Sequence, residues 1–163
     1  MDQTHLHLLI THLPIFGSIL GAVVLAHGLW IKSDHLSIAA YDIFIISGIG
    51  AGVAYLTGEA AEETVERIQG VAENMIDQHE DFALYALISL IVLGVLAIAG
   101  LFIAWKKWAF SKTFAVVVLF IALISFGLVA WTGYLGGQIR HTEISDSNVP
   151  AQGYGEQIDH DDD

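Results

Sequence analysis

Four long apolar runs dominate the chain, and short polar stretches separate most of them. A helix needs about 20 apolar residues to cross the hydrocarbon core of a bilayer. The runs that meet this length are 13–31, 36–57, 82–105 and 113–135. Each is nearly free of charge, and Asp42 lies only one turn inside the second run. The pattern predicts an all-α fold, a four-helix transmembrane bundle with up-down topology.

The connection between the second and third runs, residues 58–81, is too long for a simple turn. Apolar residues recur at helical spacing among its acids, namely Ala61, Val65, Ile68, Ala72, Met75 and Ile76. This spacing predicts an extra amphipathic surface helix over about 59–78. We expect a membrane domain over 1–144, followed by an acidic polar tail over 145–163 that extends freely or orders on a partner.

Composition supports a membrane protein with a strongly acidic polar part. Hydrophobic residues make up 55% of the chain and the net charge is −12, so apolar and acidic positions are segregated. The chain has no cysteine, which excludes disulfides, thiolate-bound iron–sulfur clusters and covalently attached c-type haem. The first run follows Asp2 and histidines rather than a basic stretch, so we expect a permanent helix and no cleaved signal.

The basic residues predict the orientation. Four of the six lie in the first and third connections, namely Lys32, Lys106, Lys107 and Lys112. The other two lie on the opposite side of the membrane, namely Arg67 and Arg140. The positive-inside rule then puts both termini outside, together with nearly all the carboxylates. An acidic outer surface argues against nucleic acid as a partner and favours a cationic protein or a metal ion.

Histidines gather at the predicted outer ends of the helices. Five of the eight do so: His5, His7 and His12 before the first run, His79 before the third and His141 after the fourth. A hydrated rim histidine is the simpler interpretation of any one of them. Convergence of three segments on one layer instead favours a cofactor, and a non-covalent haem b needs two axial nitrogens from facing helices.

We expect His12 to supply one axial nitrogen, with His79 or His141 as the second. His7 precedes His12 by five residues, about 140° around a continuous helix, so the two share a site only if the segment bends. Arg140 could pair with a haem propionate, or equally with the local acids.

A second interpretation is direct metal binding. Glu59, Glu63 or Glu80 would join the histidines as ligands of zinc, copper or iron. The same glutamates are equally consistent with a solvated helix face. Glycines also recur inside the runs, and close helix packing is favoured over a groove for a flat cofactor.

The two ends of the chain's helical part resemble motifs of a known family. Residues 7–15 read HLLITHLPI and residues 135–141 read LGGQIRH. They are similar to the HPxxxHFPI and LGGxLxxRHG motifs of the domain of unknown function 2231 family, with Leu8 in place of proline and the second motif one residue shorter. That family also has a histidine ahead of its third helix, as His79 is here. Thr142 replaces the glycine that usually follows the last histidine.

The resemblance implies a four-helix protein of the bacterial cytoplasmic membrane whose histidines bind haem or metal, and it implies no reaction. Our leading hypothesis is a b-type haem protein that relays electrons at the outer face, an electron carrier or accessory subunit rather than an enzyme. Its partner would be a cationic redox protein such as a cytochrome c, or a respiratory complex. The alternatives are the metal-binding module, and a structural subunit that packs through its glycine faces against a larger complex or copies of itself.

Overall fold

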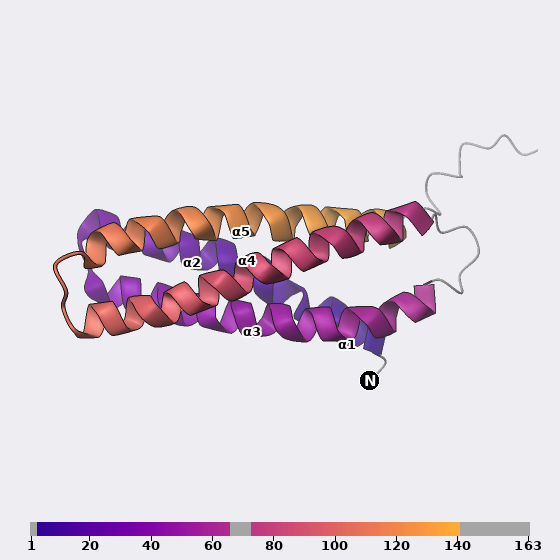
Figure 1. Ribbon diagram of the computed structural model, residues 1–163, viewed down its shortest axis with the longest axis horizontal. Coiled ribbons are helices and arrows are strands. Elements are labelled where there is room, and N and C mark those ends of the chain that lie inside the picture. The colour runs from indigo at the N-terminus through magenta and orange to yellow at the C-terminus, as the bar shows by residue number, and fades with distance from the viewer. Residues whose placement is uncertain (1–2, 66–72, 141–163) are drawn as a thin grey trace, which may run out of the picture.

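The computed structural model describes residues 3–65 and 73–140, and all regular structure in these ranges is helical. Its helices are α1 (Gln3–Ile10), α2 (His12–Ile31), α3 (Asp34–Val65), α4 (Glu73–Trp105) and α5 (Ser111–Arg140). The four long helices α2 to α5 lie side by side in an elongated bundle (Figure 1). Four segments of the described chain are long and apolar enough to cross a membrane: His7–Ile31, Asp34–Gly58, Ile76–Trp105 and Ser111–Gln138. The predicted four-helix transmembrane bundle is confirmed.

Glycines let large side chains of one helix pack directly against the backbone of the next. Phe44, which is fully buried, lies against Gly21, where an added Cβ would stand 2.5 Å from Phe44 Cε1. Tyr41 packs in the same way against Gly100, with a Cβ position 2.6 Å from its Cζ. Small residues are the usual means of close helix packing in lipid, where apolar burial gives no drive between helices. Close packing of complementary helix surfaces therefore stabilises the core, and large apolar side chains such as Phe120 remain exposed on the outer faces of the bundle.

The links at one end of the bundle are short. Lys32 adopts the left-handed conformation (φ 57°) that ends α2, and its N–H bonds to the carbonyl of Gly28. Residues 106–110 join α4 to α5, and Lys107 is again left-handed (φ 52°). Helix α1 lies at the opposite end, against the last turns of α3 (Figure 1).

The expected surface helix over about 59–78 is not a separate element in the described part of the chain. Residues 59–65 continue α3, and residues 73–78 form the first turns of α4. The reason is propagation: the alanines and glutamates after Gly58 are good helix formers, and no proline stops a helix that is already nucleated. Residues 66–72 and the tail over 145–163 lie outside the described residues.

Candidate functional site

His7 is held by α3. This histidine lies on α1, a short helix that precedes the first predicted run, and its side chain is half-buried. Its Nδ1 atom is 2.8 Å from the carbonyl oxygen of Ala54 and 3.3 Å from Thr57 Oγ1. The ring edge rests on Gly58, where an added Cβ would stand 3.3 Å from His7 Cε1. Main chain and glycine together fix how this imidazole faces α3.

His79 is held by α5 in the same manner. It lies in the second turn of α4 and is half-buried. Its Nδ1 atom is 3.1 Å from the carbonyl oxygen of Thr132, a buried residue of α5. One turn further along α5, a Cβ added to Gly136 would stand 3.0 Å from His79 Cε1. Two helices of the rim thus present an imidazole to a carbonyl and a glycine of a neighbouring helix.

The imidazoles of His7 and His79 lie at the same end of the bundle. His7 lies on α1 and His79 in the second turn of α4, at the end opposite the two short links (Figure 1). Two rings from distant parts of the sequence therefore share one region at the end of the bundle.

Hydrogen bonding fixes the tautomer of these rings in their neutral form. A backbone carbonyl can only accept a hydrogen bond, so Nδ1 must carry the proton in His7 and in His79. The lone pair then lies on Nε2, for which no hydrogen-bond partner is found among the described residues. Histidines that ligate metal ions in proteins nearly always donate their other N–H to such a partner. Both rings therefore have the second contact that a ligand histidine needs.

His12 lies elsewhere on the rim. It is exposed, and its Nδ1 atom is 2.7 Å from the carbonyl oxygen of Leu8 in its own segment. Its ring stacks with Phe16, at 6.1 Å between ring centroids and 15° between planes. It lines an apolar surface groove of about 400 Å³ together with Ile43 and Ile46 of α3. His12 thus faces a groove between α2 and α3, whereas His79 faces α5, and no described contact joins this predicted pair.

The other predicted residues take no described part in the site. His141 lies outside the described residues, and the side chains of Arg140 on α5 and of Glu59 and Glu63 on α3 also lie outside what the structure describes. Glu80 is exposed. Within the described residues, no three or more histidine or acidic side chains form a group that could hold a metal ion. The described part of the chain offers the imidazoles of His7 and His79, each held by a carbonyl of another helix.

The sequence predicts a role for His7 but does not pair it with His79. The signal that could have linked them is glycine: Gly58 and Gly136 stand at the helix positions that face the two rings. When the order of the helices around the bundle is not known, these glycines indicate only close helix packing.

Known proteins give no further guide to this site. Comparisons of the chain with family profiles, with curated proteins and with solved structures each find no match. The similarity of the end motifs to the domain of unknown function 2231 family stays a prediction, and the function has to be inferred from the residues themselves.

Proposed function

We propose that the protein is a membrane-bound b-type haem protein that carries electrons at the end of the bundle where His7 and His79 lie. The observation that supports it is the presence of two imidazoles from separate helices at one end of the bundle, each with Nδ1 held by a backbone carbonyl and Nε2 without a hydrogen-bond partner among the described residues. A haem bound by two imidazoles supplies one-electron chemistry between ferric and ferrous iron.

The set of donors fits a haem better than a bare metal ion. Structural zinc sites take four protein ligands and catalytic ones three, whereas a haem iron takes two axial nitrogens. The described residues offer one imidazole on α1 and one on α4 at the same end of the bundle, and no group of three or more metal-binding side chains. Gly58 and Gly136 keep the space beside each ring free of a Cβ, and nothing lies within 4 Å of a Cβ added to Gly137.

The protein's own contribution would be orientation and surroundings. The carbonyls of Ala54 and Thr132 hold the rings and make Nε2 a stronger donor, as a hydrogen bond from Nδ1–H does for ligand histidines. Arg140, one turn beyond Gly136 on α5, is the residue we expect to pair with a propionate.

Charge at this end favours a cationic electron partner. Asp77, Glu80 and Asp81 are exposed in the first turns of α4, close to His79 in sequence. Negative surface charge attracts a basic protein and speeds its encounter. By the positive-inside rule this end would face outward from the bacterial cytoplasmic membrane, because Lys32, Lys107 and their neighbours lie at the other end.

The test is an absorption spectrum of the protein, expressed with ample haem and purified in mild detergent. We expect a Soret band in the oxidised protein and a sharp visible band on reduction. His7→Ala and His79→Ala should each lower the haem content or convert the spectrum from two axial imidazoles to one. His12→Ala is the matched control, since it removes an imidazole from the same rim, and it should keep the spectrum of the original protein.

Three results would count against the proposal. A protein that shows no Soret band would end it, and stoichiometric zinc or copper without porphyrin would favour the metal-binding module. Loss of the spectrum in His12→Ala with retention in His7→Ala would transfer the axial ligand to His12. Thermal unfolding of each variant separates the loss of a ligand from the loss of the fold.

A further inference from the structure

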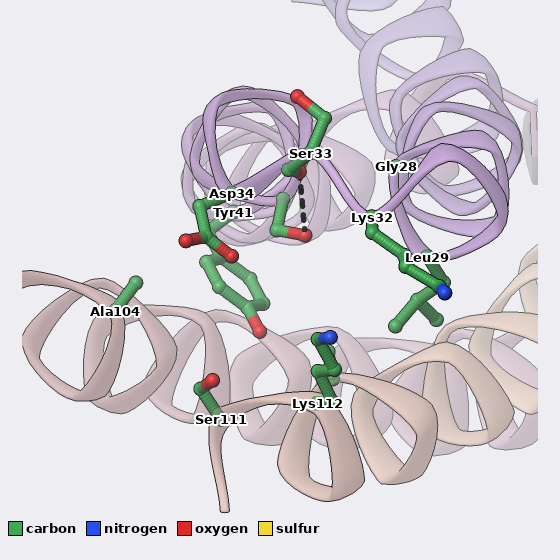
Figure 2. Close-up of a pocket in the computed structure, with 11 residues that line it drawn as sticks. Gly28, Leu29, Lys32, Ser33, Asp34, Tyr41, Ala104, Ser111 and Lys112 are labelled. Carbon is green, nitrogen blue, oxygen red and sulfur yellow. Dashed lines mark hydrogen bonds between the residues drawn. The ribbon is translucent and has the colours of Figure 1, made fainter. Parts of the chain in front are cut away.

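The opposite end of the bundle contains a small recess between all four long helices (Figure 2). It lies where the link between α2 and α3 approaches the end of α4 and the start of α5. Its volume of about 20 Å³ holds one group the size of a water molecule. The polar residues that matter here are Lys32, Asp34, Tyr41, Ser111 and Lys112.

The hydroxyl of Tyr41 points into this recess. Figure 2 shows the hydroxyl directed toward the start of α5, near Ser111 and Lys112. The residue is only 2% exposed, and its ring is fixed against Gly100. No hydrogen bond to this hydroxyl is found among the described residues. Buried polar groups almost always have a partner, so the recess should receive an acceptor or donor from outside.

Positive charge surrounds the mouth of the recess. Lys32 ends α2 and Lys112 lies in the first turn of α5, and the side chains of both line the recess (Figure 2). The start of α5 adds the positive pole of a 30-residue helix. Asp34 also lines the recess and offsets one of the two lysines, so the balance of the three side chains is positive. An anionic oxygen suits this site better than a neutral one.

We propose that the recess binds the phosphate of an anionic membrane lipid. One phosphoryl oxygen enters and accepts the hydrogen bond from Tyr41, while Lys32 and Lys112 flank the rest of the phosphate. Tyr41 lies seven residues after the start of α3, about 10 Å along the helix, which is near the depth of a lipid headgroup. Basic pockets between membrane helices are known to take such headgroups.

The aromatic residues at this end favour a lipid over free phosphate. Trp30, Trp105 and Trp108 are 85%, 73% and 44% exposed, and exposed tryptophans typically mark the headgroup level of a membrane. A lipid whose phosphate enters the recess would lay its acyl chains along the exposed apolar faces of the helices. The site lies at the other end of the bundle from His7 and His79, so it does not depend on a haem there.

Lipid binding can be measured by native mass spectrometry of the purified full chain with phosphatidylglycerol, and with phosphatidylcholine, a zwitterion of no net charge, as the comparison. We expect one preferentially retained phosphatidylglycerol, and about tenfold weaker retention in Tyr41→Phe, as for the loss of one hydrogen bond to a charged group. The double variant Lys32→Gln with Lys112→Gln should lose the preference. Lys107→Gln is the matched control, because it removes a charge from the same end without lining the recess.

Several outcomes would overturn the proposal. Retention by Tyr41→Phe equal to that of the original protein would mean that only water fills the recess. An equal loss in Lys107→Gln and in the double variant would reduce the effect to general surface charge. Displacement of the lipid by millimolar inorganic phosphate would make the ligand free phosphate. Tyr41→Phe keeps the ring against Gly100, and equal thermal unfolding would show that its fold is unchanged.

Discussion

Alanine at Gly136 tests whether the α5 backbone holds His79 as the structure describes. The new Cβ would stand 3.0 Å from His79 Cε1 and 3.3 Å from Nδ1. Carbon atoms in good contact lie about 3.5–4.0 Å apart, so the ring would have to withdraw by about 0.5 Å. Thr132, whose carbonyl holds Nδ1 at 3.1 Å, is one turn away on the same helix. A ring that moves away from Gly136 also moves away from Thr132, and the distance from Nδ1 to the Thr132 carbonyl oxygen would then exceed the limit of a hydrogen bond.

The neighbouring residue gives a matched control, because nothing lies within 4 Å of a Cβ added to Gly137. Glycine to alanine in a helix stabilises by about 0.5–1 kcal/mol when space allows, and Gly137→Ala should show this gain. Gly136→Ala should lose most of it, since a net hydrogen bond contributes about 0.5–1.5 kcal/mol. We therefore expect the two variants to differ by about 1 kcal/mol in free energy of unfolding.

The more decisive measurement is nitrogen NMR of the protein labelled at histidine, with the His79 signal assigned by its absence in His79→Ala. The Nδ1–H of His79 should be protected from exchange in the original protein and in Gly137→Ala, and should exchange rapidly in Gly136→Ala. If a haem is bound, Gly136→Ala should also alter its spectrum. Equal protection in both glycine variants would refute the contact between His79 and the α5 backbone.

Two further predictions concern the packing of the bundle, measured by unfolding in mixed detergents. Gly21→Ala should destabilise the fold by about 1–3 kcal/mol, since its Cβ would meet the fully buried Phe44 at 2.5 Å. Gly127→Ala is the control and should not destabilise the fold, because nothing lies within 4 Å of the added Cβ. Equal effects of the two substitutions would contradict the packing described. Ser47→Ala should cost about 0.6 kcal/mol, because it removes a buried hydrogen bond of 3.2 Å to the carbonyl of Pro14 on another helix; a stabilised variant would show that this bond contributes nothing.

The fold could be predicted from the sequence because it depends on a property of each segment alone. Every run of about 20 apolar residues must form a helix to satisfy its backbone in lipid, whatever its neighbours. The ends of the helices depend on something else. Beyond Gly58 the chain leaves the apolar run, yet α3 continues to Val65, because a helix stops at a breaker and not at a change of polarity.

The site was predicted only in part, because it depends on which helices face one another. The sequence placed His7 and His79 on the same rim, and the helices that carry them, α1 and the start of α4, lie at the same end of the bundle (Figure 1). It also favoured His12, whose ring faces the groove between α2 and α3. From the sequence, Lys32 and Lys112 predict only the orientation of the protein in the membrane, because nothing in the sequence places Tyr41 between them. Order around a bundle is set by packing of helix pairs, which one sequence does not display.

Because main-chain carbonyls hold His7 and His79, the orientation of each ring is a measure of the spacing between two helices. No substitution at Ala54 or Thr132 deletes the oxygen that accepts the bond, so point changes there leave the anchor in place. A slide of α5 along α4 would instead turn the His79 ring directly. Any partner that shifts these helices would thereby change the direction of a nitrogen lone pair at this end of the bundle.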